Sequence, residues 1–240
     1  MRFFIDSPIT EKVALIGEDA RHIAKVLRLR PGDGITLCDM RGTDYAAVIE
    51  AVETGAVTTR VTGSNPSKGE AAVRLRLYQA LPKSDKMDGI VQKSVELGVH
   101  EIIPVLTHRC VARPDKASIP KKWERWQRIA YEAAKQSGRG MVPQILPLME
   151  YKSAIGAMAG EGGILLYENS IAPLSAVLGN RAGAKRISLM IGPEGGFEPS
   201  EIELARGLGV ADASLGKRIL RCETAPIAAL TCVMVCFGEL

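Results

Sequence analysis

The pattern of hydrophobic and polar residues changes near residue 65 of the 240-residue chain. Before that point, short segments rich in β-branched and aromatic residues alternate with turn-forming residues, and one helix is predicted at about Asp19–Leu29. Arg30–Gly34 combines proline, glycine and aspartate in a way that is typical of a tight turn. Short strands separated by such turns indicate a small β-barrel. The predicted strands are Phe3–Ile5, Lys12–Leu15, Ile35–Cys38, Tyr45–Val52 and Thr58–Val61.

A polar segment, Ser64–Glu70, ends this first pattern. It is rich in turn-forming residues and poor in apolar ones, which is typical of a linker. We therefore predict two domains, 1–68 and 69–240. In the second domain, strand-like apolar runs alternate with helix-periodic segments, which predicts an α/β fold with a mostly parallel sheet. Strands are expected at Val73–Leu81, Ile102–Leu106, Ile164–Tyr167 and Ile187–Ile191, and helices at Asp85–Gly98, Trp123–Gln136 and Thr224–Phe237.

The composition is that of an ordinary globular protein, with 46% hydrophobic and 24% charged residues. No apolar run reaches the length of a membrane span, and the first residues become charged too soon for a signal peptide. The five cysteines are odd in number and include no Cys-x-x-Cys pair, which argues against a disulfide framework and a zinc site. We expect no metal, no membrane association and a cytoplasmic location, with Cys232 and Cys236 as buried thiols.

Positive charge is concentrated in the middle of the chain. Residues 71–150 carry 14 Lys and Arg against 8 Asp and Glu, whereas each flanking segment carries one more acidic than basic residue. A basic segment is typical of a protein that binds nucleic acid. Most charged runs only face solvent, so charge alone gives weak support to this interpretation.

Two glycine-rich turns lie late in the chain. Ile187–Phe197 is predicted to be a buried strand that ends in a turn containing Gly192, Gly195 and Gly196, and Leu215–Ala225 is a second turn that leads into an apolar helix. Glycine lets the backbone adopt positive φ and approach a ligand closely. A single glycine turn is often only a connection, but two turns with charged residues favour a binding site.

These turns differ from phosphate-binding loops. Phe197 follows Gly196, where a Walker loop needs a lysine, and the dinucleotide fingerprint belongs near the start of a βαβ unit. Glu194 places a carboxylate among the backbone amides, where it would repel an anion. The turns therefore predict a cationic or neutral cofactor.

The run Ile-Gly-Pro-Glu-Gly-Gly-Phe at Ile191–Phe197 and the run Leu-Gly-Lys-Arg-Ile-Leu-Arg-Cys-Glu-Thr-Ala at Leu215–Ala225 resemble the signature loops of the SPOUT superfamily of RNA methyltransferases. The resemblance is closest to the RsmE family, which methylates N3 of a uridine in small-subunit (16S) ribosomal RNA, and it covers essentially the whole chain. Cys222 stands where that family usually has threonine, and Lys217 where it often has proline. Thr and Cys are close in size, so we expect Cys222 to affect a hydroxyl hydrogen bond and not the loop.

The resemblance implies a SPOUT fold with a C-terminal deep trefoil knot around a mostly parallel sheet, preceded by a small PUA-like RNA-binding β-barrel. It also implies a homodimer, since SPOUT enzymes generally pair through their knotted domains. The loops of the knot would bind S-adenosylmethionine. Carried over by position, the implied cofactor-binding residues are Leu166, Tyr167, Glu168, Gly192, Pro193, Glu194, Gly195, Gly196, Leu215, Gly216, Ile219, Leu220 and Arg221.

Methylation of uridine N3 requires in-line positioning of the two reactants and removal of the N3 proton by a base. Glu194 and Glu223 are the carboxylates of the two signature runs, and Arg221 or Arg218 is expected to stabilise negative charge on the uracil oxygens. We predict catalytic roles for Arg221, Glu223 and Glu194. For Glu223, a favourable interaction with the dipole of the following helix is an equal alternative. The uridine must be unpaired or flipped out, because N3 lies on the Watson–Crick edge.

Basic residues outside the turns are candidates for contact with 16S ribosomal RNA in the small ribosomal subunit. Phosphate contacts of this kind position an RNA without reading its sequence. For His22 and Arg28 there is an alternative to RNA contact: Ile23 packs in the core, and these polar side chains only face solvent. Trp123 and Trp126 are expected in the core. The predicted RNA-binding residues are His22, Arg28, Lys83, Lys86, Arg109 and Arg139.

Two other functions fit the same sequence. A SPOUT enzyme can act on a ribose 2′-hydroxyl or on transfer RNA, because a shared fold does not decide the target. An RNA-binding ribosome assembly factor without catalysis is an alternative of another class. The N-terminal barrel and the Glu-Thr-Ala run favour the uridine N3 methyltransferase.

Overall fold

The computed structural model describes residues 1–115 and 117–240 and divides into two compact units. The first unit contains Met1–Glu70 together with Ala134–Val142, and the second contains Ala71–Ala133 and Pro143–Leu240. The sequence pattern predicted a single domain boundary, after residue 68. It therefore assigned 134–142 to the second domain, whereas this segment packs with the first unit.

The first unit is built on a five-stranded sheet in the order β1-β3-β4-β5-β2. Only the β1–β3 pair is parallel among these neighbours, and register shifts interrupt the long β4–β5 pairing. One face buries an apolar core that includes Phe3, Ile23 and Leu37. The strands are β1 (Arg2–Phe4), β2 (Lys12–Ile16), β3 (Gly34–Cys38), β4 (Thr43–Glu53) and β5 (Ala56–Pro66). β5 therefore continues into the segment that was predicted to be a linker.

The predicted helix of the first unit is divided into two short pieces. α1 (Gly17–Arg21) continues directly into a π-helix, η1 (His22–Leu27). η1 ends at Arg28, which has a left-handed backbone with φ of 53°. Its one buried residue, Ile23, anchors the helix on the core of the sheet. His22 and Arg28 are thereby left exposed.

The second unit contains a sheet in the order β12-β10-β11-β6-β7-β8, with β9 also paired to β7. All of the pairings are parallel. Parallel sheets are covered on both faces, which explains the nearly continuous apolar strands in the sequence. The strands are β6 (Arg74–Ala80), β7 (Glu101–Leu106), β8 (Gln144–Ile145), β9 (Met149–Glu150), β10 (Ile164–Leu166), β11 (Arg186–Ile191) and β12 (Ala211–Ala213). The mostly parallel α/β sheet is confirmed, whereas the knot stays a prediction.

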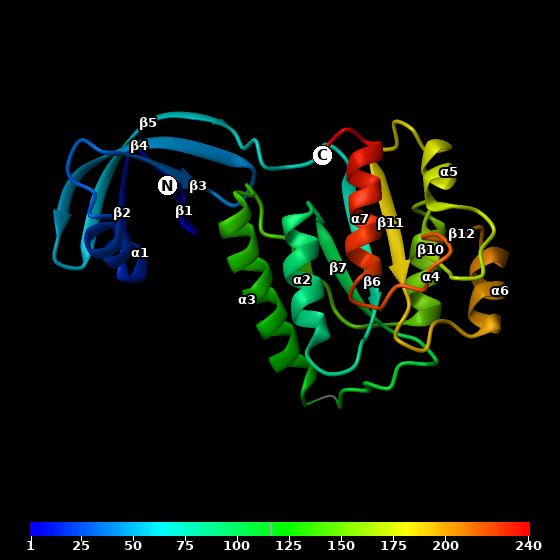
Figure 1. The fold of residues 1–240 in the computed structure, drawn as a ribbon. Coiled ribbons are helices and arrows are strands. Elements are labelled where there is room, and N and C mark those ends of the chain that lie inside the picture. The colour runs from blue at the N-terminus through cyan, green and yellow to red at the C-terminus, as the bar shows by residue number, and fades with distance from the viewer. Residues whose placement is uncertain (116) are drawn as a thin grey trace. The chain divides into compact units, whose positions relative to one another are not determined.

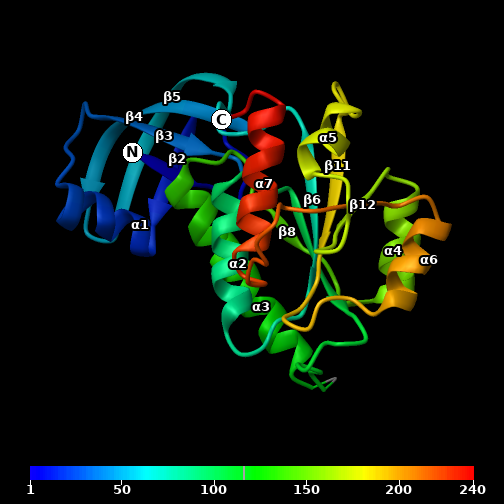
Figure 2. The same cartoon turned by 45° about the vertical axis from the view of Figure 1, so that its right-hand side comes forward.

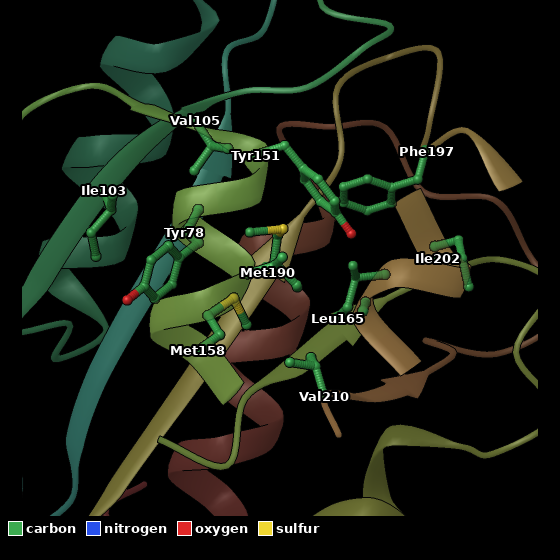
Figure 3. Packing of buried hydrophobic residues seen from close by; sticks show 13 residues of the cluster. Tyr78, Ile103, Val105, Tyr151, Met158, Leu165, Met190, Phe197, Ile202 and Val210 are labelled. Atoms are coloured by element: carbon green, nitrogen blue, oxygen red, sulfur yellow. The ribbon is translucent and has the colours of Figure 1, made fainter. Parts of the chain in front are cut away.

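Helices cover both faces of this sheet (Figures 1 and 2). α2 (Lys86–Glu96) and α7 (Ala225–Cys236) lie together on one face, and α4 (Tyr151–Ala159) and α6 (Pro199–Gly207) lie on the other. Figure 3 shows the second face, where Tyr78, Leu165 and Met190 of the strands pack with Met158 of α4 and Ile202 of α6. α5 (Leu174–Gly179) packs beside α7, and α3 (Ile119–Ser137) is the longest helix.

Trp123 and the two late cysteines differ from their predicted environments. Trp126 is buried, as predicted, but 41% of Trp123 is exposed and its indole N–H donates to the carbonyl of Ile145 at 2.5 Å. Cys232 and Cys236 are exposed. α7 is apolar all round, but only one side of it packs on the sheet, so the prediction that these thiols are buried is wrong.

None of the described helices is long and apolar enough to cross a membrane. Within residues 1–115 and 117–240, the side chains of His, Cys, Asp and Glu form no group of three or more suited to hold a metal ion.

Candidate cofactor site and active site

Three loops enclose a cavity of about 500 Å³ at the carboxyl ends of the strands β10, β11 and β12. Ligands of open α/β sheets bind at this end of the strands, and small-molecule sites have volumes of about 300–1,000 Å³. The loops contribute Leu166–Glu168, Ile191–Phe197 and Leu215–Cys222, and Ala225 completes the wall. Every residue that the sequence predicted to bind the cofactor lines this cavity.

The first glycine loop follows directly from the end of β11. Gly196 has a φ of 65°, and its N–H donates to the carbonyl of Pro193 at 3.0 Å, which closes the turn. A side chain at Gly192 would approach the Phe197 ring to 3.1 Å, because that ring packs directly against the loop. The loop therefore presents backbone to the cavity, as its glycine content predicted.

Arg109 supports this loop from outside the cavity. Its guanidinium donates to the carbonyl of Gly195 at 2.9 Å and to the carboxylate of Glu198 at 2.8 Å. The hydrogen bond with Glu198 raises the pKa of Arg109. Glu198 in turn begins α6 in a capping box with Glu201. Arg109 was predicted to contact RNA, whereas these contacts give it a role in shaping the glycine loop.

Lys86 joins the two signature loops. This first residue of α2 places Nζ 3.1 Å from Glu194 Oε1 and 3.1 Å from Glu223 Oε2. Hydrogen bonds with Glu223 and then Glu194 raise the pKa of Lys86. Lys86 was also predicted to contact RNA, but its ammonium is held between these two carboxylates. No local pattern in the sequence indicates this contact, since it joins residues far apart in the chain.

Glu194 and Glu223 are both held as anions. Burial alone would raise the pKa of Glu194, but hydrogen bonds from its own N–H, from Lys86 and from the N–H of Lys83 lower the pKa of Glu194 to about 2. Hydrogen bonds from Cys222 and then Lys86 lower the pKa of Glu223. Glu223 precedes α7 by two residues and binds these side chains, which supports the interpretation of Glu223 as a site residue over that of a helix-dipole partner.

Cys222 belongs to the same cluster. Its thiol donates to Glu223 Oε2 at 3.1 Å. Burial, followed by the nearby carboxylates of Glu223 and Glu194, raises the pKa of Cys222 to about 12, so the thiol keeps its proton at neutral pH. The thiol thus makes a hydrogen bond of its own at this position.

Arg218 and Arg221 are exposed on the cavity wall. This placement is compatible with stabilising charge on a substrate that enters from solvent, although the catalytic role of Arg221 stays a prediction. Ile219 lies between them and is 85% exposed. Sequence reasoning did not assign Ile191, Phe197 or Ala225 to the site, yet they also line the cavity.

The remaining RNA candidates lie in different surroundings. Lys83 is exposed next to the first glycine loop, and its N–H donates to Glu194 at 3.1 Å. Arg139 is only 2% exposed and pairs with Glu70 at 2.6 Å within the first unit. RNA contact by Arg139 therefore disagrees with the structure, because its guanidinium is buried against a carboxylate. For Lys83, His22 and Arg28 it stays a prediction.

The chain matches two family models. The RNA methyltransferase domain matches residues 69–234, and the RNA methyltransferase PUA domain matches residues 15–62. The first match covers more than half of the chain and includes all three loops of the cavity.

Similar proteins match along nearly the whole chain. Ribosomal RNA small subunit methyltransferase E of Bacillus subtilis is 32% identical over 92% of this chain and 88% of its own length. The same-named protein of Synechocystis is 34% identical over 92% of this chain and 72% of its own.

A crystal structure of ribosomal RNA small subunit methyltransferase E from Neisseria gonorrhoeae, bound to S-adenosyl methionine, superposes with a TM-score of 0.84 at 35% identity, covering 98% of this chain and 96% of that one. A Legionella pneumophila methyltransferase bound to the same cofactor gives a TM-score of 0.80 at 30% identity, covering 98% and 96% of the two chains. The two domain matches, the relatives and the shared SPOUT fold lead to one conclusion: this chain belongs to the ribosomal RNA small subunit methyltransferase E family.

Proposed function

We propose that this protein uses S-adenosylmethionine to methylate N3 of one uridine in 16S ribosomal RNA of the small ribosomal subunit. The observation that carries this proposal is the cavity formed by both signature loops at the carboxyl ends of β10, β11 and β12. A relative of 35% identity binds S-adenosyl methionine and is a small-subunit ribosomal RNA methyltransferase. The choice of uridine N3 rests on the resemblance of the two signature runs, and we expect the uridine to lie in the decoding region near the 3′ end.

The residues of the cavity fit this cofactor. Backbone groups of Gly192–Gly196 can approach the ligand closely, while Leu215 and Leu220 offer apolar surface for its adenine ring. Anionic Glu194 suits a cationic ligand better than a phosphate. When bound, S-adenosylmethionine supplies an electrophilic methyl group on a sulfonium.

The protein has to position the base and move one proton. Glu223 is more accessible to the N3 proton than Glu194, because its side chain is 41% exposed and that of Glu194 only 19%. Arg221 on the cavity wall stabilises the negative charge that develops on the uracil oxygens as N3 loses its proton. Holding the reactants in line contributes about 7–11 kcal/mol in well-oriented systems, and a positioned base contributes about 10²–10⁴-fold.

We also propose that the protein acts as a homodimer in the cytoplasm. The outward side of α7 exposes Cys232, Val235 and Cys236. An apolar helix face of this kind is suited to a second copy of the chain. The PUA unit is proposed to add affinity for the RNA, with His22 and Arg28 at its surface.

The test uses the chemistry of the product. A methyl group on N3 blocks Watson–Crick pairing, so reverse transcriptase stops at the modified uridine. Small subunits from a deletion strain are expected to lack this stop and to regain it on incubation with the protein and S-adenosylmethionine. A stop that persists in the deletion strain, or a methyl group found on ribose, would overturn the proposal and favour a ribose-directed SPOUT activity. Cofactor binding without methylation of any ribosomal RNA would favour an assembly factor.

A further inference from the structure

One cluster in the second unit gives the two signature carboxylates different surroundings. Lys86 of α2, Glu194 of the first glycine loop, and Cys222 and Glu223 of the second come together at the edge of the cavity. The side chains of Lys86 and Glu223 are 32% and 41% exposed, and that of Glu194 is 19% exposed. The cluster is thus open to solvent on the side of Glu223.

The oxygens of Glu194 are both in use. Oε1 lies 3.1 Å from Lys86 Nζ and 3.1 Å from the N–H of Lys83, and Oε2 lies 3.3 Å from the same N–H. A carboxylate with both oxygens engaged and a pKa of about 2 is a poor proton acceptor. Glu194 therefore acts as the fixed anion that holds Lys86.

The oxygens of Glu223 are used unequally. Lys86 Nζ and the Cys222 thiol both bind Oε2, at 3.1 Å each. The backbone N–H of Glu223 also hydrogen-bonds to this carboxylate, and the side chain is 41% exposed. The Lys86 ammonium carries three N–H donors: Glu194 and Glu223 accept two, and the Cys222 sulfur lies 3.8 Å away. These contacts hold the carboxylate through Oε2 and leave the side chain partly open to solvent on the side of Oε1.

We propose that Glu223 Oε1 accepts the N3 proton and that Lys86 is the positioning residue that orients Glu223 for this step. The inference rests on the proposed uridine N3 methylation. In the step, the N3 proton passes to Glu223 Oε1 and the N3 electron pair forms the bond to the methyl carbon. The carbon–sulfur bond breaks, and its electron pair remains on sulfur.

Lys86 also keeps the two carboxylates ionised. Two neighbouring carboxylates without a cation between them repel each other, and one then takes up a proton at higher pH. The groups facing Lys86 are Glu194, Glu223 and the neutral thiol of Cys222. Loss of Lys86 should therefore raise the pKa of Glu223 and reduce the fraction of active base at acidic pH.

The experiment measures single-turnover methylation of small subunits from a deletion strain, from about pH 4.5 to pH 9. The variants are Lys86→Met, Lys86→Arg, Glu223→Gln and Glu194→Gln, each checked for cofactor affinity by calorimetry and for folding by circular dichroism. Lys93→Met is the matched control, because Lys93 lies on the same helix and pairs only with Glu96 at 2.9 Å among the described residues.

We expect Lys86→Met to lower the rate by about 10–100-fold at pH 7 because Glu223 is no longer oriented, and to shift the acidic limb of the pH profile upward by about one unit, so that the loss grows toward acidic pH. Lys86→Arg should restore most of the rate. Glu223→Gln should lose about 10²–10⁴-fold at every pH, whereas Glu194→Gln should lose less. Lys93→Met should match the wild type.

Three results would overturn the inference. The first is a Lys86→Met rate that falls equally at all pH values, which indicates a structural role only. The second is a larger fall in the methylation rate for Glu194→Gln than for Glu223→Gln. The third is a Glu223→Gln variant that methylates at the wild-type rate. Failure of the proposed function gives a separate result, since the wild-type protein would then place no methyl group on uridine N3.

Discussion

Arg109 and Gly195 are linked by a hydrogen bond of 2.9 Å from the guanidinium to the backbone carbonyl. This bond reaches the first glycine loop from a side chain outside the cavity lining. The same guanidinium binds Glu198 at the start of α6, so the loop and the helix are held together by one side chain. The shape of the cofactor cavity therefore depends on a residue that does not line it.

Replacing Arg109 with alanine is expected to weaken S-adenosylmethionine binding about 5–30-fold, because a hydrogen bond from a charged group contributes about 1.5–3 kcal/mol, part of which water replaces. Calorimetry measures this affinity. Arg125→Ala is the matched control, since Arg125 pairs with Asp88 on the surface away from the loop. Unchanged cofactor affinity with reduced RNA affinity would instead support the original prediction of RNA contact.

Gly196→Ala should weaken cofactor binding by the loop, although it adds only one methyl group. Gly196 has a φ of 65°, and a side chain there would meet Glu168 Oε1 at 3.3 Å. The strained backbone costs about 1–3 kcal/mol, so cofactor affinity should fall at least several-fold. Gly156 of α4 provides the contrast, because nothing lies within 4 Å of its missing side chain. Gly156→Ala should raise the free energy of unfolding by about 0.5–1 kcal/mol in urea titrations.

Cys222→Ala should change the pH dependence of methylation. The thiol is the first of the groups that lower the pKa of Glu223. A carboxylate with a lowered pKa stays an active base until the pH falls through that value, so removing the thiol moves the acidic limb to higher pH. Cys222→Ser keeps a donor and should retain the wild-type limb. Identical profiles for the alanine and serine variants would show that this hydrogen bond does not tune Glu223.

The ion pair between Glu70 and Arg139 should be important for stability. Arg139 is 2% exposed, and the carboxylate of Glu70 also accepts the backbone N–H groups of Gly140 and Met141 at 2.8 and 3.0 Å. Glu70→Gln leaves a buried guanidinium without its anion, which typically costs 3–5 kcal/mol in comparable sites, so we expect a loss of about this size. Glu50→Gln is the control, since Glu50 pairs with Lys12 and Arg60 at the surface and such pairs contribute about 0–1 kcal/mol. Equal losses in urea unfolding would contradict the structural role of Glu70.

Val235→Lys tests the proposed homodimer. Val235 is 58% exposed on the outward side of α7, so a lysine there is tolerated by a monomer but places charge in a dimer interface. Light scattering should report a dimer for the wild type and a monomer for the variant. Val111 is similarly exposed, at 68%, and Val111→Lys should remain dimeric. A monomeric wild type at micromolar concentration would rule out the dimer.

The sequence predicted the second unit well because its signals are local. Continuous apolar runs marked β6, β7, β10 and β11, and the glycine turns marked the loops that line the cavity. The contacts of individual side chains were harder to predict. Lys86 and Arg109 were interpreted as RNA contacts because their charge was visible, whereas their partners Glu194, Glu223 and Glu198 are distant in sequence.

Burial was misjudged where one helix side stays uncovered. Cys232 lies in the apolar sequence of α7, and Trp123 of α3 is a large apolar residue among charged neighbours. In both cases only the tertiary packing decides which side of the helix faces solvent. Arg139 shows the opposite error: this charged residue was predicted to contact RNA, but it is buried and paired with Glu70. Local patterns carry no information on such pairings.

Residues 134–142 belong to the first unit although they follow much of the second unit in the sequence, and this affects the order of folding. Gly138 accepts a hydrogen bond from Arg2, and Arg139 neutralises Glu70, so the first unit is incomplete until these residues exist. Domains of many proteins fold in sequence as the chain leaves the ribosome, the N-terminal domain first. Here more than half of the chain must be synthesised before the PUA unit can close, and a fragment that ends at the linker would lack part of its own structure.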